Sequence, residues 1–210
     1  MIARRRAAVA IGVVAVLVIA GFLLFGGDEP LISGDHAGPG EFSFHLAGVQ
    51  ASPITRTPPS ALKDTAREAG VGIKETMDEL YFRAFVDTGS WGDYGAAFEL
   101  FDGEAQARAE SDVDVLTLGS NAKDDVEALE GPSGNLTIVV LTDKKDAPIT
   151  AIAEVQFLAD AQGKDNTTTE ITSTGSFFLR QVGGVWKIYA YRVDRDDQAG
   201  AAPSPTGSPS

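Results

Sequence analysis

The side chains best suited to proton transfer are few in this sequence, and most lie outside the region that its pattern predicts to fold. The two histidines of the chain, His36 and His45, both precede residue 60, where a strong amphipathic pattern begins. Histidine is the commonest general acid or base, and it must lie within hydrogen-bonding reach of the reacting group. A histidine-based pair would therefore require this leading segment to fold back into the domain, which we do not expect.

Tyrosine and aspartate are the remaining candidates for an acid–base pair, because a buried tyrosine can donate a proton that a carboxylate accepts. The residues that could supply such a pair are Tyr81 and Tyr94 with Asp112 and Asp114. Their surroundings are acidic, which is typical of a solvated surface. We therefore predict no catalytic residue and no enzymatic activity.

Closely spaced aspartates raise the question of a metal site. These aspartates are Asp112 with Asp114, Asp124 with Asp125, and Asp194 with Asp196 and Asp197. None of these groups has the loop glycine and the distant bidentate glutamate of a helix–loop–helix calcium site. Cysteine is absent, which excludes thiol catalysis, cysteine-ligated zinc, iron–sulfur clusters and disulfides. We predict no metal and no cofactor.

The charge of the chain limits its partners. Its formal net charge is −13 at pH 7. Phosphate groups would be repelled by such a surface, so nucleic acid and an anionic lipid surface are both disfavoured as partners. High net charge also keeps a protein soluble, and this is the simpler meaning of the acidity.

A charge-free apolar segment begins at Ala7, directly after three arginines, and ends at Phe25. A helix of about 19 residues is roughly 28 Å long, close to the thickness of the hydrocarbon core of a bilayer. We predict a transmembrane helix over 7–26. Positive residues favour the cytoplasmic side, so the basic flank 1–6 is expected in the cytoplasm and the body outside a single-pass plasma-membrane anchor.

A cleaved secretory signal is the alternative for this segment. Such signals have a shorter apolar region, of about 7–15 residues, followed by small residues before the cut. Here the apolar run is longer, and it continues into Gly26-Gly27-Asp28 without an alanine-x-alanine pattern. A retained anchor is therefore favoured, and the body leaves the cytoplasm in either case.

An extracytoplasmic linker is predicted over 27–59, because this stretch is rich in glycine, proline, serine and threonine. Within it, Phe42, Phe44 and Leu46 alternate with polar residues. This period of two predicts an edge strand over 41–47.

A long amphipathic helix is predicted from Ser60, which is a suitable N-cap after two prolines, to Gly89, a suitable stop. Apolar residues recur in it at intervals of three and four, which places them on one face. Two glycines flank Val71, so a bend or a division into two helices is left open there. A shorter helix is predicted from Ala96 through Ala105, ending in the charged stretch before Asp112.

Antiparallel strands are predicted for the second half of the chain, because the pattern changes to a period of two with turn residues between the runs. The expected strands are 126–130, 136–142, 149–161, 168–182 and 185–194. Strands this long must bend or twist strongly. The fold class is therefore α+β: a domain over 60–196 in which a long and a short helix pack on a strongly curved antiparallel sheet, a cone, with a disordered tail over 197–210.

The closing hairpin carries a resemblance to a known fold. Its strands contain Gly175-Ser176-Phe177-Phe178-Leu179-Arg180 and Gly184-Val185-Trp186-Lys187-Ile188-Tyr189-Ala190. With the preceding helices, this resembles the nuclear-transport-factor-like, or cystatin-like, cone superfamily. The chain is similar to actinobacterial single-span proteins of that superfamily, such as those associated with mammalian-cell-entry transporters. Its enzymes hold tyrosine, aspartate or a histidine–aspartate pair inside the cone, but no residue here matches those positions. A fold hosts many functions, so the resemblance alone selects none.

The aromatic residues are the remaining candidates for a binding site. An open cone would present some of them in an apolar pocket, whereas a filled cone would bury them as core. We favour the filled cone. The candidate pocket or interface aromatics are Trp91, Tyr94, Phe98, Phe101, Phe157, Phe177, Trp186, Tyr189 and Tyr191.

Two functions follow from these observations. The first is a membrane-anchored, non-catalytic module that binds a partner protein or supports a membrane or envelope complex, because an anchor and a spacer precede a domain without catalytic motifs. The second is a small hydrophobic ligand-binding protein, or an isomerase- or cyclase-like enzyme, that uses the cone pocket. A homodimer through the exposed face of the sheet is left open, and no nucleic acid is expected.

Overall fold

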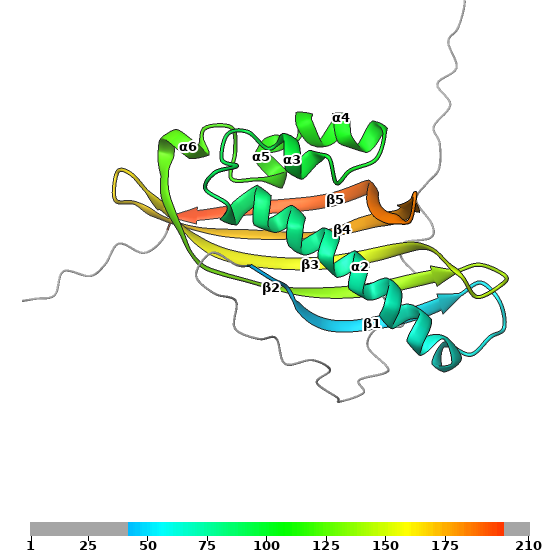
Figure 1. The fold of residues 1–210 in the computed structure, drawn as a ribbon. Helices are drawn as coiled ribbons and strands as arrows, with labels where there is room; N and C mark the ends of the chain where they lie inside the picture. The colour runs from blue at the N-terminus through cyan, green and yellow to red at the C-terminus, as the bar shows by residue number, and fades with distance from the viewer. Residues whose placement is uncertain (1–41, 200–210) are drawn as a thin grey trace, which may run out of the picture. The chain divides into compact units, whose positions relative to one another are not determined.

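The computed structural model describes residues 42–199, which form an α+β fold with a helical layer on one face of a curled five-stranded sheet (Figure 1). The basic flank, the predicted anchor 7–26 and residues 27–41 of the predicted linker lie outside the described residues, as does the end of the chain from residue 200. Within 42–199, no helix combines the length and the apolar character needed to cross a bilayer.

The sheet is mixed rather than antiparallel, which corrects the sequence prediction. Its strands are β1 (His45–Pro53), β2 (Val126–Thr142), β3 (Pro148–Gly163), β4 (Thr168–Val182) and β5 (Val185–Ala199), in the order β1-β2-β3-β4-β5. β1 pairs with β2 in parallel, and the other neighbours are antiparallel. Parallel neighbours need a long crossover connection, and here the helical segments between β1 and β2 supply it.

The first strand lies further along the chain than the prediction of 41–47. Phe42 and Phe44 alternate as predicted, and both side chains are buried in the core. The strand itself begins only at His45. The period of two therefore correctly predicted which side chains face inward. It did not predict where the strand begins, because that depends on where the chain pairs with β2.

The second strand is continuous where a turn was predicted. Gly131-Pro132-Ser133-Gly134 was expected to separate two strands, yet β2 passes through it with an irregularity in register between Glu130 and Ser133. Gly131 has a φ of 59°, which favours glycine. This extra length is accommodated as a bulge, a common way to bend a long strand. At the other end of the sheet, β5 reaches Ala199, beyond the predicted domain end at residue 196.

One continuous helical segment of 28 residues crosses the sheet diagonally (Figure 1). It comprises a 3-10 turn η1 (Pro59–Leu62), the helix α2 (Lys63–Tyr81) and a π turn η2 (Phe82–Val86). It begins at Pro59, so Ser60 is inside the first turn rather than the N-cap. The helix is neither divided nor ended near Val71.

The predicted second helix is instead two short ones, α3 (Gly95–Phe98) and α4 (Glu104–Ser111). Two further short helices follow it, α5 (Val113–Leu116) and α6 (Ala122–Asp125). Between α3 and α4, Phe101 forms an isolated parallel bridge to Ile188 of β5. The backbone N–H of Asp102 donates to Ile188 O at 2.8 Å, and the N–H of Ile188 donates to Leu100 O at 3.0 Å. Pairing with the edge of β5 thus interrupts the helix.

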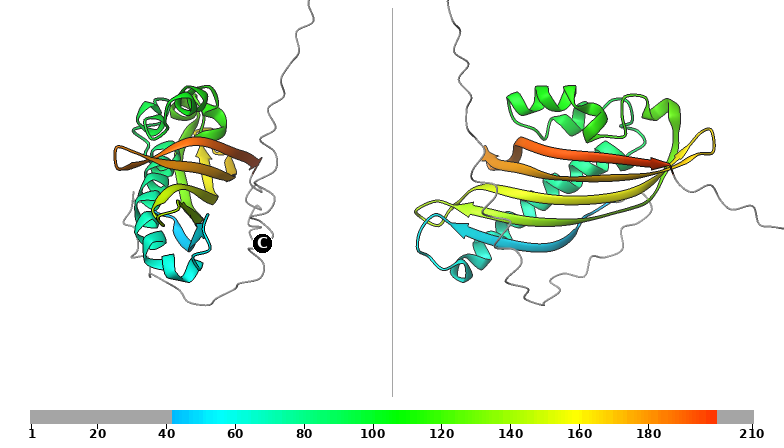
Figure 2. Two further views of the ribbon diagram at one scale, coloured as in Figure 1. Left: turned by 90° about the vertical axis from the view of Figure 1, so that its right-hand side faces the viewer. Right: turned by 180° about the vertical axis from the view of Figure 1, so that it is seen from behind.

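The hydrophobic core lies between the helical layer and the sheet. At its centre, the rings of Tyr81 and Phe85 stack with centroids 5.3 Å apart, and Phe85 lies 4.8 Å from Phe157. Phe44 meets Tyr81 edge-on at 4.9 Å. Figure 2 shows that the helices are all on this side of the sheet, so no helix or strand of residues 42–199 covers its opposite face.

Candidate functional site

The inner face of the sheet is packed with aromatic side chains. Of the nine aromatic residues predicted to line a pocket or an interface, eight are buried: Trp91, Tyr94, Phe98, Phe101, Phe157, Phe177, Trp186 and Tyr191. Tyr189 differs, because its side chain is 38% exposed. The rings that would line an open cone instead contact one another, as Phe101 contacts Tyr191 at 5.5 Å. Aromatic side chains therefore occupy the space between the helices and the curled sheet.

Three of the buried aromatics have their polar atoms satisfied within the fold. Trp91 donates from Nε1 to Phe85 O at 2.9 Å, and Tyr94 donates from its hydroxyl to Gly119 O at 3.0 Å. The Tyr81 hydroxyl is 3.0 Å from the Ser173 hydroxyl in the core. Buried polar groups require such partners, because an unpaired one costs about 1–3 kcal/mol. These bonds are consistent with structural roles.

A tyrosine–aspartate pair does form, but with a different tyrosine from the predicted ones. The Tyr191 hydroxyl donates to Asp112 Oδ2 at 2.8 Å. The Arg108 guanidinium lies over the Tyr191 ring, 4.5 Å from its centroid, and its Nε is 3.2 Å from the same carboxylate. Burial, followed by the bond to Asp112, raises the pKa of Tyr191. A tyrosine held protonated beside a carboxylate already paired with arginine is a poor proton donor.

Tyr81 and Tyr94 do not meet a carboxylate in a catalytic arrangement. Burial raises the pKa of both, and the bond to Ser173 only partly offsets this for Tyr81. Asp114 instead accepts a hydrogen bond from the backbone N–H of Ser120 at 3.2 Å. Among residues 42–199, no three histidine or acidic side chains gather as metal ligands would.

A serine–lysine–aspartate cluster lies where the chain enters the fold. Lys74 Nζ is 2.6 Å from Asp78 Oδ2 and also contacts the Ser43 hydroxyl, which donates to the same oxygen at 2.9 Å. The backbone N–H of Phe44 donates to Asp78 Oδ1 at 2.9 Å. The Ser43 hydroxyl donates to the Asp78 carboxylate and accepts from Lys74, which is not the arrangement of a serine nucleophile with a lysine base. The cluster instead fastens residues 43–44 to α2.

The outer face of the sheet carries an apolar row across four strands. The strand register aligns Val139 with Ile152, Ile152 with Phe178, and Phe178 with Ala190. Val139 is buried although it does not belong to the core cluster. Tyr189 adjoins the row, with its ring 6.4 Å from that of Phe178. The sequence placed Tyr189 among the candidates but missed Phe178, although the alternation with Phe177 could have placed it on the other face.

Open surface grooves among the described residues include the following two. The first, of about 340 Å³, is lined by acidic residues and Lys164 at the β3–β4 turn. The second, of about 430 Å³, lies between α2 and the β4–β5 hairpin and includes Trp186. Neither lies within the aromatic core. The sequence identified Trp186 but missed its helical neighbours, because their proximity depends on how α2 crosses the sheet.

Comparison of the chain with protein-family models, with curated proteins and with solved structures finds no match in any of the three.

Proposed function

We propose that this chain is a membrane-anchored, extracytoplasmic, non-catalytic module that binds a partner protein or supports a membrane or envelope complex. The observation that carries the proposal is the filled inner face of the sheet. Phe157 and Phe177 are almost completely buried there, together with the Tyr81–Ser173 pair. An active site needs a cavity that admits a substrate. Because the inner face of the sheet is filled, the outer surfaces of the domain are the regions through which it would interact.

The likeness to the nuclear-transport-factor-like cone superfamily belongs to the same proposal. The features that support it are the long helix across a curled sheet and the closing β4–β5 hairpin. The superfamily's enzymes use the interior of the cone, so the packing here counts against the alternative of a ligand-binding protein or an isomerase-like enzyme.

Crosslinking in intact cells tests the binding role. A photoreactive amino acid at Tyr189, on the outer face, or at Val185, beside the groove of Trp186, should capture a distinct protein that co-purifies with the full chain. The matched control places the same group at Asp64, an exposed residue at the start of α2. If no protein is captured above the control at either position, the proposal is wrong.

Membrane topology can be tested directly, because the chain has no cysteine. Single cysteines replacing Ala3 and Ser208 provide one label on each side of the predicted span. In intact cells, a membrane-impermeant maleimide should label the second variant and not the first until the cells are opened. Recovery of the full chain in a detergent-free soluble fraction would contradict the anchor.

A further inference from the structure

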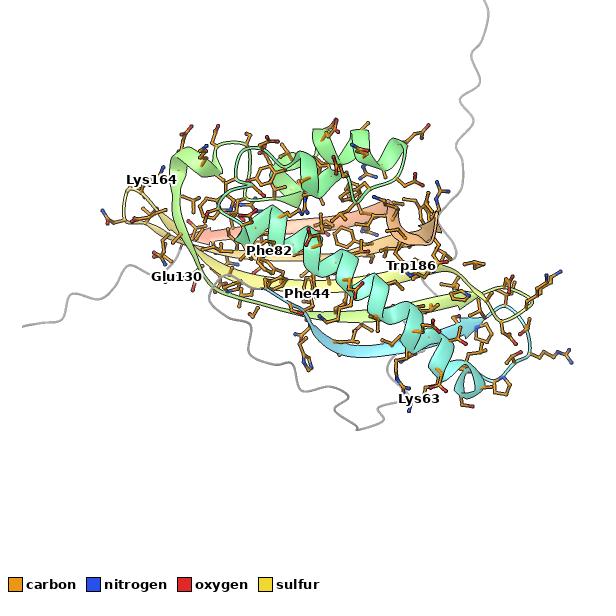
Figure 3. The ribbon with its side chains drawn as sticks, in the orientation of Figure 1. Phe44, Lys63, Phe82, Glu130, Lys164 and Trp186 are labelled. Atoms are coloured by element: carbon orange, nitrogen blue, oxygen red, sulfur yellow. The ribbon has the colours of Figure 1, made fainter. Side chains whose placement is uncertain are left out.

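The groove beside Trp186 combines an aromatic wall with acidic residues. Its walls include Gly72, Glu75 and Glu79 of α2, and Val185 and Trp186 of the β4–β5 hairpin. Figure 3 shows Trp186 at the end of the sheet where this hairpin lies beside α2. The open volume of about 430 Å³ is in the range of sites that hold a few side chains or a small ligand.

The indole of Trp186 presents its donor edge to the glycine that lines this groove. A Cβ added at Gly72 would lie 3.0 Å from Cδ1 and 3.5 Å from Nε1 of Trp186. The Thr76 hydroxyl holds the two elements together, since it lies 3.3 Å from Trp186 O and 3.0 Å from Gly72 O. Glycine at position 72 therefore keeps this edge of the ring open.

The indole N–H of Trp186 finds no acceptor within residues 42–199. This contrasts with Trp91, the other tryptophan, whose Nε1 donates to Phe85 O. The Trp186 side chain is only 5% exposed. Its Nε1 atom is not enclosed, because Thr142 Oγ1 is the one fully enclosed side-chain polar atom without a partner among residues 42–199. A donor without a protein acceptor that reaches the surface at the edge of an open groove marks a position for an acceptor atom from a ligand.

Two glutamates one helical turn apart provide negative charge at the groove. Glu79 is paired with Arg83. Glu75 is exposed and forms no ion pair with any residue from 42 to 199. The nearby Lys187 is directed to Glu99 O, at 2.6 Å. Glu75 thus remains available to a cation from outside.

The apolar part of the site comes from the hairpin. Val185 is 56% exposed and presents an apolar side chain at the wall of the groove. An aliphatic chain that ends in a cation would contact Val185 and Trp186 along its length and reach Glu75 with its head. Lysine and arginine side chains have this form.

We infer that this groove binds a lysine or arginine side chain within a basic segment of a partner protein. The cation pairs with Glu75, the alkyl stem packs on Val185 and Trp186, and a backbone carbonyl of the segment accepts the Trp186 indole N–H. The inference rests on the proposed binding function and names the chemistry of the partner. The net charge of −13 favours the approach of such a segment.

The two indole signals allow a direct test by NMR. The ¹⁵N-labelled full chain in detergent micelles is titrated with the peptide acetyl-Gly-Lys-Val-Lys-Gly-amide, and the same peptide with both lysines acetylated is the control. The basic peptide should shift the Trp186 indole signal saturably and leave the Trp91 signal in place. The acetylated peptide should leave both signals unchanged.

Matched variants locate the binding site. Glu75→Gln should weaken the peptide about threefold or more, the effect of one ion pair of about 0.7 kcal/mol. Glu68→Gln removes the same charge from the same helix away from the groove and should change affinity by less than about 1.5-fold. Gly72→Ala should abolish the Trp186 shift, while an unchanged Trp91 signal confirms that the fold is intact.

Several outcomes would overturn the inference. These are an unshifted Trp186 signal, equal shifts with the acetylated peptide, or equal affinity for butylammonium, which would indicate a site for small cations. A shift on increasing protein concentration alone would assign the groove to a second copy of the chain. If crosslinking captures a partner while the peptide fails to bind, the binding function stands and only this assignment fails.

Discussion

The Tyr81–Ser173 pair is the most enclosed polar contact of the aromatic core. Its two hydroxyls lie 3.0 Å apart, on α2 and β4, and both residues are almost fully buried. Polar groups at such depth are tolerated only when paired, because water cannot replace a lost partner. The pair therefore fixes how the helix lies on the sheet rather than serving a reaction.

A double-mutant cycle would measure this contact. Ser173→Ala leaves the Tyr81 hydroxyl without a partner and should lower the free energy of unfolding by about 1–3 kcal/mol. Tyr81→Phe should cost about 1–2 kcal/mol, and the double variant should cost clearly less than the sum of the two. Chemical denaturation of the full chain in micelles provides the values, and strict additivity would show that the hydroxyls do not interact.

Alkaline pH should destabilise the domain through its buried tyrosines. Burial raises the pKa of Tyr81, Tyr94 and Tyr191 above the ordinary value near 10. Below pH 10 these groups are protonated in both the folded and unfolded states, so they do not make stability vary with pH. Above it the unfolded chain loses protons that the folded chain retains, so stability falls as pH rises.

Absorbance at 295 nm during an alkaline titration, followed together with circular dichroism, would check this. Ionisation of these three tyrosines should coincide with unfolding rather than precede it. The fall in stability should be less steep in Tyr191→Phe. Ionisation of all tyrosines near pH 10 in a folded protein would contradict the burial described here.

At the scale of elements, Asp78 fastens the segment ahead of β1 to α2. Asp78→Ala removes the acceptor for the Phe44 N–H and the partner of Lys74. We expect a loss of about 1–3 kcal/mol in the free energy of unfolding and faster amide exchange at Phe44. Asp78→Asn should cost less, because an amide oxygen can still accept from Phe44. Asp64→Ala, which breaks an exposed pair with Arg67, should cost less than about 0.5 kcal/mol.

The β4–β5 pair requires a glycine at position 175. A Cβ there would collide with the carbonyl oxygen of Arg192 and lie 2.9 Å from the Cα of Val193, both backbone atoms of β5. Since backbone cannot move aside without breaking the ladder, Gly175→Ala should cost about 2 kcal/mol or more. Gly48→Ala in β1 is the matched control, because no atom lies within 4 Å of its added Cβ. Equal melting temperatures of the two variants would refute the close approach.

At the scale of the whole molecule, the uncovered outer face predicts self-association. Phe178, aligned with Ile152 and Ala190, gives this face an apolar row that a second copy could cover. Analytical ultracentrifugation in density-matched detergent should show a dimer, and Phe178→Glu should weaken it about tenfold or more. Thr174→Glu, on the same face but in a polar row, is the control. A monomer at all concentrations would contradict the prediction.

Much of the fold follows from local pattern, as α2 and the last three strands illustrate. The apolar spacing after Ser60 predicted a helix whose buried residues include Ile73, Met77 and Leu80, and these are in the core. The long strands end close to the turns that glycine and asparagine predicted. Local periodicity indicates which side of an element is buried, because an element with one buried face has apolar residues repeating at the period of that element.

The sequence by itself therefore determined the α+β class, the inward-facing residues, the acidic charge and the absence of thiol chemistry. Only the tertiary structure decided that β1 runs parallel to β2, that β2 bulges instead of turning, and that Trp186 borders a groove with Glu75. These features depend on pairings between residues far apart in sequence. A local pattern records that a side chain is buried, but the partner that buries it is chosen by the packing of the complete fold.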